Sequence, residues 1–203
     1  MLIGVDFDNT IVRYDRLFEE AARERGLLKA PGAATKEQVR DALRADGREE
    51  EWIELQGAVY GPRMKDAELF PGAAEFFVDC RRRGVPVRII SHRTLHPFRG
   101  PQHDLHEAAR GFLRLHGFYD PARIGLKESE VFFELTKQAK LERIRSQGCT
   151  HFVDDLPEFL AEPGFPAGVE RLLFDPAGLR GASADTRRAG SWAELAEMLL
   201  DGR

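Results

Sequence analysis

The chain has 203 residues, of which 42% are hydrophobic and 32% are charged, and its net charge is −4 with neutral histidines. This length can bury one substantial core with a small appended subdomain, and the composition excludes a disordered or fibrous protein. The mild acidity gives no electrostatic basis for a nucleic acid polymer or an anionic membrane as the main partner.

The cysteine content and the hydropathy pattern bear on the cellular compartment. Cys80 and Cys149 are the only two cysteines, which is too few for a disulfide framework and favours a reducing cytoplasm. The sequence contains no run of about 18 apolar residues, the length that crosses a membrane as a helix. We therefore expect a cytoplasmic protein that does not span or bind a membrane.

The N-terminal third consists of one short strand followed by a helical region. Residues 2–5 are a short apolar run typical of a strand. From about residue 14 to residue 66, apolar residues recur at helical spacing in three stripes. The segment KAPGAAT at 29–35 interrupts the stripes, and Thr35 with Gln38 predicts a capping box at the start of the second helix.

After residue 70 the pattern changes to strands and helices in alternation. We predict helices at 73–83, 105–116, 136–147 and 191–200, the last with Ser191 as its N-cap, and strands at 85–90, 130–133, 151–153 and 171–174. We expect the stretch from about 156 to 188, which is rich in Gly and Pro, to be largely loop. The predicted fold class is α/β, with a Rossmann-like, three-layer core in which helices cover both faces of a parallel sheet.

Short polar side chains stand at the ends of three predicted strands, and two lysines begin the helix before the last of these strands. Ligands of open α/β sheets bind in the crevice beyond the carboxyl ends of the strands. We therefore expect these side chains to meet in one crevice. They are Asp6, Asp8, Ser91, Lys137, Lys140, Asp154 and Asp155.

Four carboxylates in one crevice indicate a bound cation. Unpaired carboxylates at close range repel one another and raise each other's pKa, and Mg²⁺ removes this repulsion. A nearby lysine balances further charge, and the hydroxyl of Ser91 can donate to a phosphate oxygen. Positioning and charge neutralisation are most of what phosphoryl transfer requires, so these residues predict a phosphoryl-transfer site with Mg²⁺ as cofactor and an aspartate as nucleophile.

Four segments of the sequence resemble the signatures of the haloacid dehalogenase (HAD) superfamily. VDFDNT resembles the first signature, an apolar strand followed by D-x-D-x-T, and IIS resembles the second. KLERIRSQG, which begins at Lys140, and the following HFVDD are similar to the third and fourth. The segments occur in the family's order from residue 6 to residue 155. D-x-D-x-T alone is a weak signal, but all four signatures in order are a strong one.

The resemblance implies a role for each matched residue. Asp6 would be the nucleophile, and Asp8 would protonate the leaving oxygen and then activate the attacking water. Ser91 and Lys140 would bind the phosphoryl group, while Asp6, the backbone carbonyl of Asp8, and Asp154 would hold Mg²⁺. A second acid at Asp8 is the feature associated with phosphatases and phosphotransferases, and dehalogenases lack it. The resemblance therefore implies a phosphatase that forms an aspartyl-phosphate.

Two assignments within the matched segments stay open. Lys140 lies 14 residues before Asp154, with one helix and a turn between them, and this spacing resembles the family better than that of Lys137. We therefore prefer Lys140 as the active-site lysine. Asp155 either binds the metal, directly or through water, or anchors its loop.

The helical region between the first signature and the remaining strands resembles a C1-type cap. In this superfamily such an insertion is a lid that excludes water from the phosphoryl site and selects the substrate. We accordingly predict a core domain of residues 1–12 and 69–203 and a small helical cap of residues 13–68 inserted after the first strand.

The stretch SHRTLHPFRGPQHDLHEAAR contains four of the six histidines and directly follows the second signature. Three interpretations stay open: a zinc site, since clustered histidines can ligate metal; a loop and helix start with exposed histidines; or contacts to the rest of the substrate at the crevice mouth. Under the last interpretation, and with the end of the first signature included, the candidate substrate-binding residues are Asn9, Thr10, His92, Arg93 and Arg99.

The expected partner is a small phosphorylated metabolite, and the same residues are compatible with two other functions. A phosphotransferase with a non-water acceptor would use the same groups, and a non-catalytic HAD-like binding protein would keep the fold. A receiver-type signalling domain is disfavoured by the order of the acidic residues. In a receiver two adjacent acidic residues come early and the acceptor aspartate comes in the middle, whereas here D-x-D-x-T opens the chain and the adjacent pair, Asp154 and Asp155, comes late. A homodimer is an open alternative to a monomer.

Overall fold

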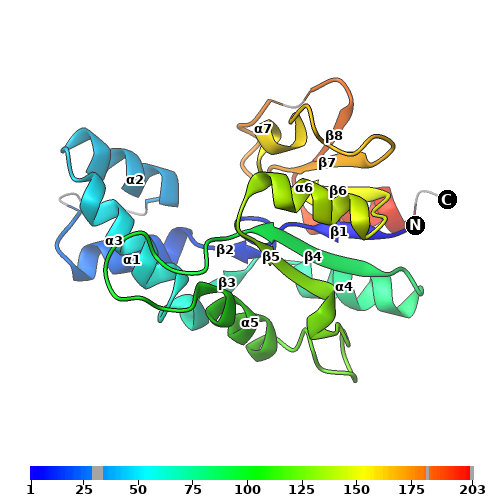
Figure 1. Ribbon diagram of the computed structural model, residues 1–203, viewed down its shortest axis with the longest axis horizontal. Helices are drawn as coiled ribbons and strands as arrows, with labels where there is room; N and C mark the ends of the chain where they lie inside the picture. Colours follow the sequence, from blue (N-terminus) through cyan, green and yellow to red (C-terminus); the bar gives the residue numbers. More distant parts are fainter. Residues whose placement is uncertain (29–33, 182, 202–203) are drawn as a thin grey trace. The chain divides into compact units, whose positions relative to one another are not determined.

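A six-stranded parallel sheet forms the centre of the fold in the computed structural model, which describes residues 1–28, 34–181 and 183–201 (Figure 1). The strands lie in the order β5-β4-β1-β6-β7-β8, and every pairing between them is parallel. The first strand of the chain therefore lies inside the sheet, between β4 and β6. The strands are β1 (Ile3–Val5), β4 (Val87–His92), β5 (Val131–Glu134), β6 (His151–Asp154), β7 (Glu170–Phe174) and β8 (Thr186–Ala189).

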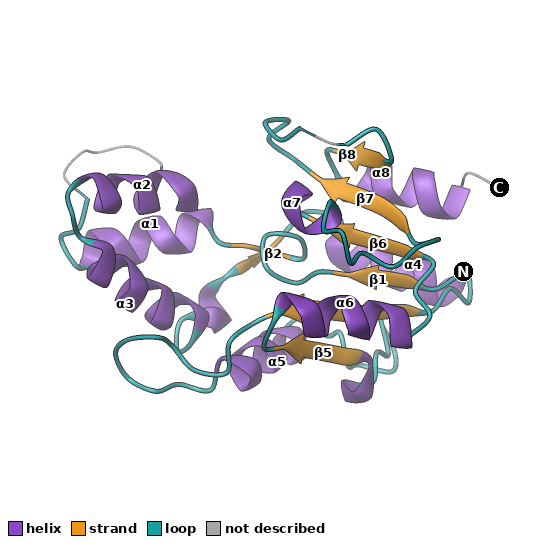
Figure 2. Cartoon of the chain, turned by 45° about the horizontal axis from the view of Figure 1, so that its top comes forward, coloured by secondary structure: helices purple, strands orange, loops and turns teal. Residues whose placement is uncertain are grey.

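Helices cover both faces of this sheet, with α6 and α7 over one face and α4 and α8 over the other (Figure 2). The predicted α/β class with a three-layer, Rossmann-like core is confirmed. Among the described residues, none of the helices is both long enough and apolar enough to cross a membrane. The helices of this part are α4 (Ala73–Arg82), α6 (Lys137–Ser146), α7 (Pro157–Leu160) and α8 (Trp192–Ala196), with the short helical segments η2 (Glu128–Glu130) and η3 (Glu197–Asp201).

The sequence located most of these elements but missed the edge of the sheet. The side chains of Thr136 and Ser191 cap α6 and α8 by accepting hydrogen bonds from backbone N–H groups, and the cap at Ser191 confirms the prediction. The prediction of a largely loop stretch at 156–188 is wrong for α7 and for the start of β8. Only Ala189 of β8 is buried, so this edge strand lacks the apolar alternation by which a strand is recognised.

Each face of the sheet has its own apolar core. Beneath α6 and α7 the buried residues are Ile90, Leu141, Ile144, Cys149, Phe152, Phe159, Leu160, Phe165 and Leu173. On the other face, the rings of Phe76, Phe174 and Trp192 are in contact. A Cβ at Gly4 of β1 would lie 2.5 Å from a ring carbon of Phe152, so only glycine lets the strand that carries the acidic motif lie against this ring.

The chain divides into two compact units, and the division differs from the predicted one. The first unit comprises Met1–Val12, Leu69–Arg93 and His116–Arg203, and the second comprises Arg13–Glu68 and Thr94–Leu115. The prediction assigned 94–115 to the core. In the structure this segment packs with the second unit because α5 (Leu105–Leu115) buries its apolar face against η1 and α3. The role of the second unit as a cap stays a prediction.

The second unit is a small helical assembly around aromatic residues. Phe18 packs on Trp52 with 5.0 Å between ring centroids, and Tyr14 packs on Tyr60 at 5.1 Å. The predicted capping box of Thr35 and Gln38 is present, while most of the predicted break before it, at 29–33, lies outside the described residues. The elements are α1 (Asp15–Glu24), α2 (Lys36–Ala45), α3 (Glu49–Tyr60), η1 (Met64–Asp66) and α5, and β2 (Val12–Arg13) with β3 (Glu68–Leu69) forms a two-stranded ribbon where the chain passes between the units.

Trp192 connects the acidic loop to the core of the first unit. Its side chain is 1% exposed, and its Nε1 donates a hydrogen bond to the carbonyl of Thr10 at 3.2 Å. We expect Trp192→Phe to lower the free energy of unfolding by about 2 kcal/mol, because it leaves a buried carbonyl unpaired and removes packed ring atoms. Urea unfolding measures this loss. Leu179→Ala, at a residue that is 86% exposed, is the control; an equal effect of both substitutions would contradict the assignment.

Candidate active site

The parallel register of the central strands brings the acidic residues together. Asp6 directly follows β1, and its backbone N–H donates to the carbonyl of Val153 on β6 at 2.8 Å. Val5 is paired with Val153, so Asp154, the last residue of β6, lies beside Asp6. Ser91 lies near the end of β4 on the other side of β1. The strand ends therefore meet at one edge of the sheet, as the sequence predicted.

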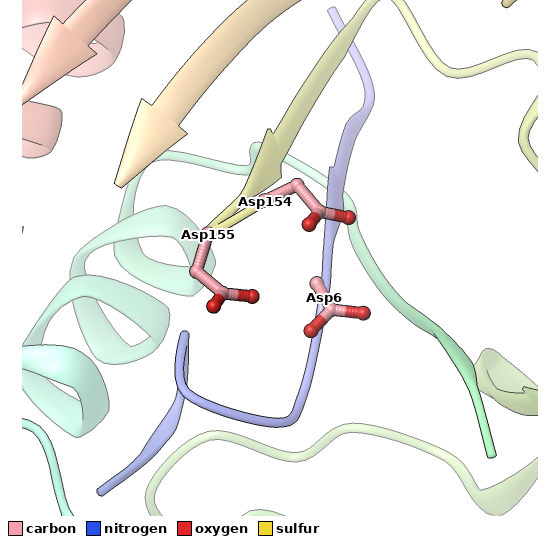
Figure 3. Close-up of side chains that lie close together, drawn as sticks. All are labelled: Asp6, Asp154 and Asp155. Atoms are coloured by element: carbon pink, nitrogen blue, oxygen red, sulfur yellow. The ribbon is translucent and has the colours of Figure 1, made fainter. Parts of the chain in front are cut away.

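Three of the carboxylates form a compact, buried group. Asp6, Asp154 and Asp155 point toward one another in Figure 3 and are 4%, 0% and 4% exposed. One oxygen of each lies within 4.8 Å of the others. Within the part of the chain that the structure describes, no other group of three acidic, histidine or cysteine side chains has this geometry. Three carboxylates in this arrangement fit a hard divalent cation such as Mg²⁺.

The two candidate lysines have different environments. The Nζ of Lys140 lies 2.5 Å from Asp6 Oδ1 and 2.6 Å from Asp154 Oδ2, and its side chain is 3% exposed. It also lies 4.1 Å above the centre of the Phe159 ring. Lys137 is 49% exposed, and its nearest carboxylate is that of Glu162 at 3.7 Å. The preferred lysine is thus the one that contacts the acidic group.

Burial and charge perturb both members of the central ion pair. The pKa of Asp6 is raised to about 7, chiefly by burial and also by the charges of Asp154 and Asp8, against the opposing effect of Lys140. Burial alone would lower the pKa of Lys140, but the adjacent carboxylates of Asp154 and Asp6 raise it instead. One lysine ammonium therefore does not fully balance the acids around it, and a divalent cation would complete the neutralisation.

Asp8 is held apart from this group by a tight turn and an arginine. Asn9 adopts a left-handed backbone conformation with φ of 56°, and the N–H of Ile11 donates back to the carbonyl of Phe7 at 3.0 Å. Both carboxylate oxygens of Asp8 accept from Nη1 of Arg93, at 2.7 and 2.8 Å. The side chain of Asp8 is therefore not part of the close carboxylate group, and only its backbone carbonyl remains a predicted metal ligand.

The other predicted phosphate and substrate residues have different environments. Ser91 and Thr10 are 1% and 0% exposed, and among the described residues the hydroxyl of Thr10 has no hydrogen-bond partner. His92 is exposed at the end of β4. Arg93 is directed to Asp8, and Arg99 belongs to the second unit, where it pairs with Glu50 and Glu54 of α3. Their roles in substrate binding stay predictions.

The histidine-rich stretch does not form a zinc centre in the described ranges. Among the described residues, the close group of candidate metal ligands consists of Asp6, Asp154 and Asp155, and it includes no histidine. His96 Nδ1 instead forms a hydrogen bond with the carbonyl of His103 at 3.1 Å, inside the loop that precedes α5. This contact favours the interpretation of the stretch as a loop and helix start.

Sequence reasoning missed the arginine that contacts Asp155. Nη1 of Arg180 donates to the Asp155 carbonyl and lies 3.4 Å from its Oδ2. The loop that carries Arg180 is folded around the buried Asp175, whose carboxylate accepts from the N–H groups of Leu179 and Arg180. This loop follows β7 in the Gly- and Pro-rich stretch, where apolar periodicity gives no signal. An acidic residue directly after a strand, as at Asp175, was the available clue.

The first unit also contains a cavity of about 390 Å³ that is separate from the acids. Its lining includes Val87 at the start of β4 and Glu130 just before β5. These are the amino ends of the strands, whereas the acidic group stands at their carboxyl ends. In open α/β sheets the carboxyl ends carry the ligand site, so we assign the candidate active site to the acids and not to this cavity.

Comparisons with known proteins identify similar solved structures. Protein Tyrosine Kinase A of Mycobacterium tuberculosis has a TM-score of 0.64 at 20% sequence identity and covers 98% of this chain and 97% of its own. A HAD family hydrolase from Deinococcus radiodurans R1, solved with bound phosphate and sodium, has a TM-score of 0.59 at 15% identity, with 98% and 95% covered. A structure described as a dehalogenase gives 0.59 at 15% identity, with 98% and 96% covered.

These likenesses establish the fold over nearly the whole chain. Identities of 20% and below carry no further conclusion about activity. No protein-family model matches the sequence, and no curated protein does.

The repulsion around Asp6 predicts a measurable effect on stability. Because the pKa of Asp6 is about 7 in the folded chain and 3.8 is its ordinary value, ionisation of Asp6 costs stability increasingly as the pH rises from about 4 to 7. We expect Asp6→Asn to stabilise the metal-free protein by roughly 2 kcal/mol at pH 8 and by less at pH 5.

Thermal unfolding in EDTA at the two pH values tests this expectation. Asp79→Asn, at a carboxylate that pairs with Arg82 on α4, is the matched control and should change neither midpoint. A midpoint of Asp6→Asn at or below that of the unsubstituted protein at pH 8 would contradict the account.

Proposed function

Because the chain has the fold of the haloacid dehalogenase-like hydrolases, we propose that it is a Mg²⁺-dependent phosphatase that hydrolyses a small phosphomonoester through an aspartyl-phosphate on Asp6. The observation that carries this proposal is the buried group of Asp6, Asp154 and Asp155 with Lys140 bound to two of its members. A single buried carboxylate could be neutralised by one cationic side chain and would not indicate a ligand site. Three carboxylates with one ammonium are the charge arrangement of a site that receives a cation and a phosphate.

Different side chains of the site bind the cation, the nucleophilic carboxylate and the phosphoryl group. When bound, Mg²⁺ would be held by Asp6, Asp154 and Asp155 and would supply charge neutralisation for the phosphoryl oxygens. Lys140 holds Oδ1 of Asp6 and so fixes the carboxylate, which leaves Oδ2 of the same residue to face the phosphorus atom. The hydroxyl of Ser91 donates to a phosphoryl oxygen.

Two displacements at phosphorus complete the proposed reaction. In the first, Asp6 attacks, the bond from phosphorus to the ester oxygen breaks, and Asp8 gives that oxygen a proton, so that an alcohol leaves. In the second, Asp8 takes a proton from water, the water oxygen attacks phosphorus, and the bond to Asp6 breaks. Inorganic phosphate is released and both aspartates return to their first state.

One similar structure adds support for phosphate as the ligand. The Deinococcus hydrolase of this fold was solved with bound phosphate and sodium, so the fold accommodates an anion of this kind together with a cation. For this chain we propose a small phosphorylated metabolite as the substrate and Mg²⁺ as the cation. A cytoplasmic location and the alternative of a homodimer stay predictions.

A phosphotransferase is the second candidate. Protein Tyrosine Kinase A of Mycobacterium tuberculosis shares the fold, and a kinase transfers phosphate to an acceptor other than water. The residues of the proposed site serve either acceptor, since only the second displacement differs. Addition of a small alcohol distinguishes the two: a transferase forms a new phosphate ester in place of part of the inorganic phosphate. A non-catalytic binding protein would do neither.

The function is tested by release of phosphate from 4-nitrophenyl phosphate and from a panel of small phosphorylated metabolites. We expect turnover that requires Mg²⁺ and is lost with EDTA and in Asp6→Asn. Absence of turnover together with absence of Mg²⁺ binding would sink the proposal. Turnover that persists in Asp6→Asn would exclude the nucleophile we assign.

The two lysines of α6 provide a matched pair of variants. We expect Lys140→Met to lower kcat by about a thousandfold, because it removes the cation that fixes Asp6 and neutralises the phosphoryl group. Lys137→Met, on the exposed side of the same helix, should keep kcat within about twofold. Steady-state kinetics with 4-nitrophenyl phosphate measure both, and equal losses in the two variants would contradict the assignment of Lys140.

A further inference from the structure

Arg93 forms a largely buried ion pair with Asp8. Its Nη1 lies 2.7 Å from one carboxylate oxygen of Asp8 and 2.8 Å from the other. The side chain of Arg93 is 3% exposed and that of Asp8 is 22% exposed. The guanidinium is thus enclosed by protein, while the carboxylate that it contacts is partly open. Arg93 is therefore in a position to orient the Asp8 carboxylate while that carboxylate stays accessible.

The position of Arg93 is fixed by contacts that are independent of Asp8. Its backbone N–H donates to the carbonyl of Glu134 at 2.8 Å, which continues the pairing of β4 with β5 by one residue. Its guanidinium lies 5.7 Å above the centre of the Phe7 ring, and that ring packs edge-on against Phe133 of β5 at 5.4 Å. Arg93 is therefore preorganised by the sheet and its aromatic neighbours.

Asp8 depends on this support because the chain around it is a turn. The turn is closed by the N–H groups of Ile11 and Val12, which both donate to the carbonyl of Phe7. These bonds fix the backbone around Asp8, and the orientation of its side chain depends on the contacts of the carboxylate itself. The contact with Arg93 gives the carboxylate one orientation, and a charged donor holds an oxygen more strongly than a neutral one does.

We propose that Arg93 is a positioning residue for proton transfer by Asp8 and not a substrate-binding residue. The inference rests on the proposed function. When Asp8 gives its proton to the ester oxygen, the O–H bond of Asp8 breaks, the O–H bond of the alcohol forms, and a negative charge is left on the carboxylate. Arg93 holds that carboxylate in line with the leaving group and stabilises the charge as it forms.

This role makes the effect of Arg93 depend on the leaving group. A 4-nitrophenolate leaves without much help from a proton donor, whereas an alkoxide leaves only when it is protonated. We expect Arg93→Gln to lower kcat on an alkyl phosphate by about a hundredfold and on 4-nitrophenyl phosphate by only about threefold, with KM changed little on both. A residue that binds the phosphoryl group would raise KM on both substrates alike.

The experiment measures kcat and KM of the variants on aryl and alkyl phosphates of increasing leaving-group basicity. Arg93→Gln should show the same dependence on the leaving group as Asp8→Asn, and the double variant should be no worse than Asp8→Asn alone. Arg93→Lys keeps the charge and should recover part of the loss on the alkyl phosphates. Arg88→Gln is the control, since Arg88 is also on β4 but pairs with Glu130.

The outcomes separate this inference from the proposed function. A loss that grows with the basicity of the leaving group, with partial recovery in Arg93→Lys, supports the positioning role. A uniform loss with a raised KM, or no loss, would overturn it while leaving the phosphatase assignment intact. If the unsubstituted protein hydrolyses none of the series, the proposed function fails and this inference fails with it.

Discussion

The buried contact of Lys140 with Asp6 and Asp154 is the interaction on which the rest of the site depends. It joins α6 to the ends of two neighbouring strands, and the side chains of Lys140 and Asp154 are 3% and 0% exposed. Buried charges of this kind contribute little net stability, because the loss of hydration offsets their attraction. Lys140 contacts both carboxylates, so the three residues form a unit. Phe152 and Phe159 lie against the ammonium and keep this environment dry.

A second feature is that the two aspartates of the first signature have separate cations. Asp6 is paired with Lys140 and belongs to the carboxylate group that fits a metal, whereas Asp8 is paired with Arg93 and its side chain lies outside that group. The turn at Asn9 produces this separation within two residues of chain. Two residues of the same type therefore have different environments, which supports our proposal that Asp6 attacks phosphorus and Asp8 transfers the proton.

The sequence was sufficient for the sheet and for the acidic group, and insufficient where contacts are not periodic. Apolar runs and capping residues located the central strands, and the polar residues that follow those strands correctly predicted that Asp6 and Asp154 lie together. Spacing favoured Lys140 over Lys137, and Lys140 is the lysine that contacts the acids.

The sequence did not reveal three features: the edge strand β8, the loop of Arg180, and the packing of 94–115 with the helical unit. Each of them depends on tertiary contacts rather than on a local pattern. Arg93 was identified as a site residue, but its pairing with Asp8 is visible only in three dimensions.

The central claim is that Asp6 becomes phosphorylated during turnover. The most direct measurement is a rapid acid quench of the protein with its substrate and Mg²⁺, followed by borohydride reduction and mass spectrometry of the N-terminal peptide. An acyl phosphate is reduced to an alcohol, whereas a free carboxylate is not, so the account predicts homoserine at position 6 and aspartate at position 8. Homoserine at another aspartate, or turnover with position 6 unchanged under conditions that trap the intermediate, would contradict it.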